Sequence, residues 1–144
     1  MEILIYTTSE GETAVVTPTP EYLANNTIED LQNKYAADGI SAYLMTKDAL
    51  PPEDFRNSWK QSNGVINEDL AMVKEMAHTR RRARRDELFK PYDEIIAKQI
   101  PGNDAQQAEQ ARVGIRDSDQ LVQQVIDNAD TVEDIRAALA AYQA

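Results

Sequence analysis

The stretch from Asn67 to Gln99 constrains the fold more than any other part of the chain. Its apolar residues recur at three- and four-residue steps, which is the spacing of one face of an α-helix. They are Ile66, Leu70, Val73 and Ala77, and further along Leu88, Tyr92 and Ile95. Asn67 is the expected N-cap, followed by two acidic residues in the first turn. The pattern predicts one long helix, or two helices joined at Pro91.

An arginine cluster interrupts this apolar stripe. It consists of Arg80, Arg81, Arg82, Arg84 and Arg85. Five arginines on two turns of helix must point in all directions, and we expect Arg80 and Arg84 to be the most buried. An unpaired buried charge is strongly destabilising, so these groups need carboxylate partners. The partners can come from the acidic helix that follows or from another subunit. An acidic partner protein and nucleic acid are the alternative ligands.

Charge is distributed unevenly along the chain, whose formal net charge is −10. Residues 1–52 carry eight acids against two lysines, and residues 99–144 carry eight acids against three arginines. The middle, residues 53–98, is almost neutral, with nine acids against ten basic residues. This balance makes general affinity for nucleic acid unlikely.

The N-terminal part has the composition of a small sheet. Two β-forming runs, residues 3–6 and 14–16, flank a polar loop with a glycine and predict a β-hairpin. Thr27, with Asp30 three residues later, predicts the start of a helix that ends near Gly39. Residues 42–45 predict a third strand. Residues 53–59 follow two prolines and form either a short helical turn or an extended arm.

The C-terminal part is predicted to be helical. Asn63-Gly64 predicts a turn and the boundary between two units, residues 1–62 and 65–144. Pro101-Gly102 predicts a chain reversal, so that a helix over residues 104–128, interrupted at Ser118 or Asp119, packs antiparallel to the long helix. Thr131 is the expected cap of a short last helix. The predicted fold class is therefore α+β, with a small ββαβ unit followed by an antiparallel helical hairpin and a C-terminal helix.

The residues give no catalytic signature. The chain has no cysteine and one histidine, His78, so a site needing thiolates or two histidines is excluded within one chain. Asp93-Glu94 and Asp117-Ser118-Asp119 place carboxylates together, but nothing around them predicts a sheltered cleft or a calcium loop. We therefore predict a non-enzyme with no cofactor and no metal. No apolar run is long enough to span a membrane, and we expect a cytoplasmic protein without a secretion signal.

Phe55 and Trp59 are the largest apolar side chains in the run between Pro52 and Asn63. Such residues either anchor a small core or provide a contact for a partner protein. We expect Trp59 to close the open face of the N-terminal sheet, and we also count Phe55 and Trp59, with the arginine cluster, as candidate partner-interface residues.

Short motifs along most of the chain resemble a family of small proteins encoded beside tail-fibre genes in tailed bacteriophages. The N-terminal motifs are Ile5-Tyr6, Val15-Val16-Thr17-Pro18-Thr19-Pro20 and Thr27-Ile28-Glu29-Asp30-Leu31. The central motifs are Leu50-Pro51, Phe55-Arg56-Asn57-Ser58-Trp59 and Val65-Ile66-Asn67-Glu68-Asp69. The C-terminal motifs are Arg82-Ala83-Arg84, Ile115-Arg116-Asp117 and Thr131-Val132-Glu133-Asp134.

The resemblance implies a setting in the phage tail more than a mechanism. It favours a structural protein of the tail or tail fibre that is assembled in the host cytoplasm and found in the virion. Its partners would be other tail or fibre proteins. The long charged helix and its arginine-interrupted apolar stripe favour packing between subunits, so we also expect a homo-oligomer. The first alternative is a tail-fibre assembly chaperone that leaves before the virion matures. A basic-helix nucleic-acid-binding protein is the second alternative.

Overall fold

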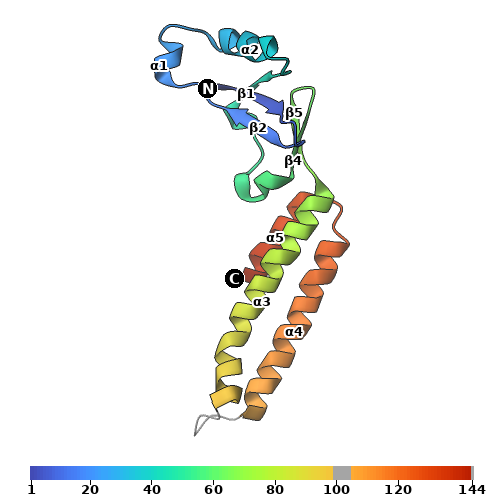
Figure 1. Cartoon of the computed structure of the whole chain (residues 1–144). Helices are drawn as coiled ribbons and strands as arrows, with labels where there is room; N and C mark the ends of the chain where they lie inside the picture. The colour runs from blue at the N-terminus through green and yellow to red at the C-terminus, as the bar shows by residue number, and fades with distance from the viewer. Residues whose placement is uncertain (99–104, 144) are drawn as a thin grey trace. The chain divides into compact units, whose positions relative to one another are not determined.

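The computed structural model describes residues 1–98 and 105–143, which form two compact units, Met1–Asp69 and Leu70–Ala144 (Figure 1). Antiparallel strands dominate the first unit and long helices the second, so the predicted α+β class is confirmed. The predicted boundary at Asn63-Gly64 lies within the first unit, because the strand after this turn pairs back on the strand before it.

The centre of the first unit is strand β1 (Glu2–Thr7). It pairs antiparallel with β2 (Thr13–Val16) on one side and with β3 (Tyr43–Thr46) on the other, which gives the order β2-β1-β3. Ile3, Leu4 and Ile5 are each 0% exposed. Successive side chains of a strand point to opposite faces, so this continuous apolar run requires cover on both faces of the sheet.

Helix α2 (Ile28–Ala37) covers one face, after the short helix α1 (Pro20–Leu23). Leu4 packs there with Ile28 and Ala42. The predicted start of α2 is confirmed as a full capping box: the Asp30 amide donates to Thr27 Oγ1 at 3.1 Å, and the Thr27 amide donates to Asp30 Oδ2 at 2.8 Å.

A second hairpin contributes the cover of the other face. Two 3₁₀ turns, η1 (Lys47–Ala49) and η2 (Glu53–Ser58), lead into strands β4 (Trp59–Ser62) and β5 (Val65–Glu68), so the helical-turn alternative for residues 53–58 is the correct one. Trp59 packs with Ile3, Ile5 and Ile66. Trp59 thus closes the open face of the sheet, as expected from the sequence.

Asn63-Gly64 forms the turn between β4 and β5. Both residues have positive φ, 49° and 83°, as a two-residue turn matched to the strand twist requires. The register pairs Lys60 with Asn67, so Asn67 is a strand residue and the predicted N-cap is wrong. The β-branched Val65-Ile66 pair favours the strand, and the long helix begins only at Leu70.

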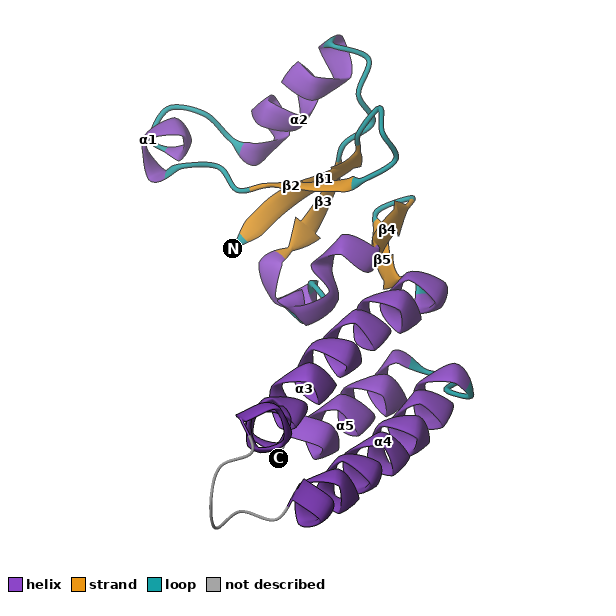
Figure 2. Cartoon of the chain, turned by 60° about the horizontal axis from the view of Figure 1, so that its bottom comes forward, coloured by secondary structure: helices purple, strands orange, loops and turns teal. Residues whose placement is uncertain are grey.

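The second unit contains α3 (Leu70–Lys98), α4 (Ala105–Asp127) and α5 (Val132–Gln143) (Figure 2). Pro91 lies inside α3 without dividing it, and α4 continues through Ser118 and Asp119, so the predicted interruption there is wrong. The contact of His78 with Asp127 joins the first half of α3 to the end of α4, and the Arg112–Asp93 ion pair joins the end of α3 to the start of α4, which makes the predicted antiparallel hairpin. Thr131 caps α5 as predicted: its Oγ1 accepts from the Asp134 amide at 3.2 Å. Pro101-Gly102 lies outside the described residues.

Candidate functional site

The arginine cluster of α3 is centred on one buried ion pair. Arg81 is 3% exposed and Asp119 of α4 is 5% exposed. Arg81 Nη1 donates to Asp119 Oδ2 at 2.5 Å, and Arg85 Nη1 lies 3.6 Å from the same oxygen. The Asp119 carboxylate compensates the buried charge of Arg81, and it also attracts the partly exposed guanidinium of Arg85.

The expectation that Arg80 and Arg84 are the most buried of the five is wrong. The buried residues of α3 are Val73, Ala77 and Arg81, each four positions after the last. This i, i+4 row continues along one helix face, so Arg81, and not its neighbours, occupies the interior position. Arg80 is half-buried, and the Arg84 side chain is 29% exposed and lies 3.5 Å from Glu87. Arg82 is exposed.

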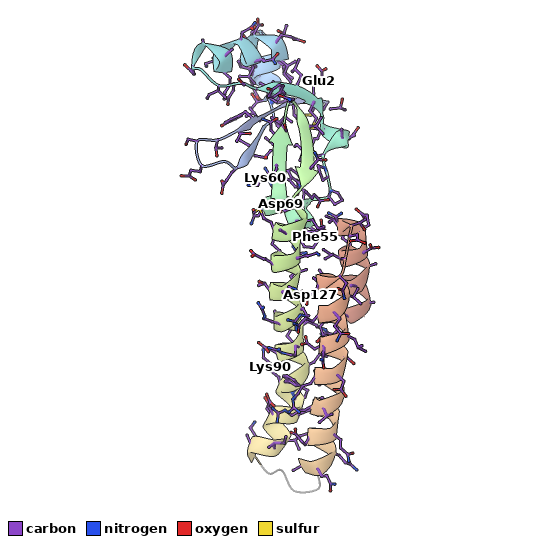
Figure 3. The ribbon with its side chains drawn as sticks, turned by 90° about the vertical axis from the view of Figure 1, so that its right-hand side faces the viewer. Glu2, Phe55, Lys60, Asp69, Lys90 and Asp127 are labelled. Atoms are coloured by element: carbon purple, nitrogen blue, oxygen red, sulfur yellow. The ribbon has the colours of Figure 1, made fainter. Side chains whose placement is uncertain are left out.

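A polar network extends from this pair to the rest of the bundle. Arg81 Nε donates to His78 Nδ1 at 3.3 Å, and His78 Nε2 lies 2.8 Å from Asp127 Oδ1. Asp127, the last residue of α4, is labelled in Figure 3. Lys74 Nζ donates to the main-chain oxygen of Asp127 at 2.9 Å. From α5, the Tyr142 hydroxyl donates to Asp119 Oδ1 at 3.3 Å. Asp119 therefore holds groups from both of the other helices and fixes their register.

The same contacts perturb the ionisation of Tyr142. Burial, together with the adjacent Asp119 carboxylate, raises the pKa of the Tyr142 phenol to about 12 from its ordinary value of 10.0. Glu109, nearer the start of α4, is a second group with a shifted pKa. The hydrogen bond from Arg116 holds the pKa of the Glu109 carboxyl below its usual value.

The raised pKa of Tyr142 predicts a loss of stability at alkaline pH. The unfolded phenol ionises near pH 10 and the folded one near 12, so its contribution is complete below pH 10 and is lost as pH rises between these values. Tyr142→Phe should remove this part of the pH dependence. Chemical denaturation at pH 9, 10 and 11 checks it, with Tyr22→Phe as the control for a tyrosine outside the bundle. An equal slope in wild type and Tyr142→Phe would contradict the assignment.

At the other end of the hairpin, a second cross-helix contact joins α3 to α4. Arg112 Nε lies 3.0 Å from Asp93 Oδ1, and its guanidinium lies 5.5 Å from the centre of the Phe89 ring. Arg112 Nη1 also donates to Glu109 Oε2 at 2.9 Å. These contacts close one edge of the seam between the two helices.

Phe55 and Trp59 belong to the first unit, whereas the arginine cluster belongs to the second. Both are buried, at 0% and 2% exposure, so neither side chain is available at the surface as the predicted partner contact. The Arg56 guanidinium lies 5.4 Å from the Trp59 ring centre, and the Trp59 carbonyl accepts from Thr13 Oγ1 at 2.9 Å. Trp59 is thus a core residue of the first unit.

The sequence reasoning missed Asp119 as the partner of Arg81. A signal existed, because Asp119 falls on the apolar row of α4 that contains Ile115, Val122 and Ile126. A carboxylate within such a row is buried when the helix packs, and it then requires a cation. Arg81 occupies the equivalent position on α3.

The described residues contain no group of three or more histidine, cysteine or acidic side chains placed to hold a metal ion. Within the same part of the chain, no helix combines the length and apolarity needed to cross a bilayer. Comparisons with protein-family models, curated proteins and solved structures gave no match.

Proposed function

We propose that this protein is a non-enzymatic structural component of the tail or tail-fibre apparatus of a tailed bacteriophage, where it mediates protein–protein assembly. The observation that carries the proposal is the resemblance set out above, whose motifs occur in both units. Several of these motifs coincide with residues on which the fold depends. Thr27 and Asp30 form a capping box, Trp59 fills the core of the first unit, and Thr131 caps α5.

The surface of the helical unit supports a role in assembly. Leu121 is 64% exposed and Val125 is 50% exposed, although both lie on a helix of a packed bundle. Exposed apolar groups of this size, one turn apart on one helix face, are typical of protein contact surfaces. The arginine cluster contributes less to an external surface than expected, because Arg81 and Arg85 already pair with Asp119.

Mass spectrometry of purified particles tests the proposal. The protein should be present in a fixed ratio to the known tail proteins if it is built into the virion. Presence in the infected cell and absence from particles, together with co-purification with unassembled fibre protein, would favour the chaperone alternative. Absence from both fractions would contradict any role in the tail.

The nucleic-acid alternative predicts a different result. Binding to DNA through phosphate contacts weakens steeply as salt rises. Three of the five arginines, Arg81, Arg84 and Arg85, already lie near carboxylates of the same unit. We therefore expect no salt-sensitive retention of the protein on immobilised duplex DNA.

A further inference from the structure

The three helices of the second unit differ greatly in length. They contain 29, 23 and 12 residues, so α5 is about 18 Å long beside an α4 of about 35 Å. Tyr142, next to the last residue of α5, reaches Asp119 near the middle of α4. From this level to the end of α3 and the start of α4, these two helices continue without α5 beside them (Figure 1). We call this part the open segment, and it consists of residues 86–98 of α3 and 105–118 of α4.

Burial changes abruptly at this level. Where α5 covers the hairpin, Val73 and Ala77 of α3, Ile126 of α4, and Ile135 of α5 are each 0% exposed. In the described part of the open segment only Ala108 is buried, and it is 4% exposed. The larger apolar side chains there are only half-buried, although they recur at helical spacing; they are Leu88, Tyr92 and Ile95 on α3 and Ile115 on α4.

The two edges of the open segment are different. Arg112 closes one edge through Asp93 and Phe89, as described above. The other edge, on the side of α5, is hollow: a depression of about 450 Å³ lies at the end of α5, with Leu88, Ser118 and Leu121 in its lining. Along α4 this edge continues through Gly114 and Ala111, one and two turns from Ser118. This hollow edge, here called the open face, lies on the same side of the hairpin as α5 and begins where α5 ends.

The open face has little net charge, although the chain carries −10. On α4 it contains the uncharged Ala111, Gly114 and Ser118. On α3, Arg84 lines the depression and lies 3.5 Å from Glu87. Helical spacing places a second opposite pair on the same side, Lys98 with Glu94, at 3.9 Å. A second copy of the chain can therefore approach this face without the like-charge repulsion that the acidic remainder imposes.

We propose that the open face binds the open face of a second copy of this chain, so that two helical hairpins complete each other as a four-helix bundle. Within each chain, α5 already occupies this side of the hairpin from Asp119 to the end of α4. The second hairpin therefore fits only against the open segment, and it must run antiparallel to the first. Its own α5 then lies beyond the end of the first hairpin where α3 ends and α4 begins. Such a two-fold contact is self-complementary, and the C-terminal end of α5 limits how far the two hairpins overlap. This interface specifies one contact within the assembly role proposed above.

Gly114→Glu tests the interface without disturbing the monomer. A Cβ added at Gly114 meets no atom within 4 Å, and a side chain there favours the helix more than glycine does. Val113→Glu is the matched control: it adds the same charge one residue earlier, at a side chain 44% exposed, and about 100° around the helix. Light scattering over a concentration series measures the mass, and circular dichroism measures helicity.

Wild type and Val113→Glu should have twice the 16.2 kDa mass of the chain, and Gly114→Glu should have that of the single chain with undiminished helicity. A monomeric wild type, or a Gly114→Glu protein that remains dimeric, would overturn the proposal. The result of this mass measurement can be distinguished from the result of the particle analysis that tests the tail function. A dimer that is absent from particles contradicts only the function, and a monomer that is incorporated contradicts only this interface.

Discussion

Asp119→Ala is expected to lower the free energy of unfolding of the helical unit by about 3–5 kcal/mol, the usual cost of leaving a buried charge without its partner. Arg81 is 3% exposed and donates to Asp119 at 2.5 Å, so removal of the carboxylate leaves the guanidinium uncompensated inside the bundle. Asp119 also accepts from Tyr142, and its loss weakens the attachment of α5. Urea denaturation followed by circular dichroism measures the change.

Asp117→Ala is the matched control, because Asp117 is exposed on the same helix two residues earlier. It should change the free energy of unfolding by less than about 0.5 kcal/mol. Replacing both members of the pair, Arg81→Met with Asp119→Leu, should recover most of the loss, since an apolar pair of similar volume has no charge to desolvate. Equal effects of Asp119→Ala and Asp117→Ala would show that the pair contributes nothing.

Trp59→Ala is expected to lower the free energy of unfolding of the first unit by about 3–5 kcal/mol, as for other buried large aromatic residues. The indole is 2% exposed and lies against Ile3, Ile5 and Ile66, so its removal leaves a cavity beneath the sheet. Trp59 is the only tryptophan, so the unfolding of the variant must be followed by circular dichroism and not by tryptophan fluorescence.

Two further substitutions separate the causes. Trp59→Phe should cost less than Trp59→Ala, because the indole Nε1 has no hydrogen-bond partner to lose and most of the apolar volume is kept. Lys60→Ala, at the exposed next position of β4, is the control for changes in strand propensity. A Trp59→Ala protein as stable as Lys60→Ala would mean that the indole contributes little to the core.

Capping residues correctly predicted the starts of two helices, because a helix start depends on residues close to it in sequence. Thr27 with Asp30, and Thr131, stand at the starts of α2 and α5 because a cap bonds to amides within three residues. The hairpin of β4 and β5 was missed because Lys60-Gln61-Ser62 is polar, and such a strand is held by its pairing with Val65–Glu68 and not by its own composition.

The arginine cluster shows the limit of reasoning from one helix. The need for carboxylate partners could be predicted from the density of arginines alone. The identity of the buried residue depended on where the apolar row of α3 continues, and the identity of its partner depended on how α4 aligns with α3. That alignment is a property of the packed hairpin, and it places Asp119 rather than an exposed acid against Arg81.

The position of β1 at the centre of its sheet has a consequence for synthesis. Ile3 and Ile5 are synthesised before their packing partners Trp59 and Ile66, which emerge from the ribosome only much later. Contacts between residues so distant in sequence form slowly, because a long loop must close before they contribute. The face of β1 that carries Ile3 and Ile5 therefore remains uncovered until β5 is complete, although β2 and β3 can pair with this strand earlier. Chains released early, before residue 66, should be aggregation-prone and should be recovered with chaperones or in the insoluble fraction.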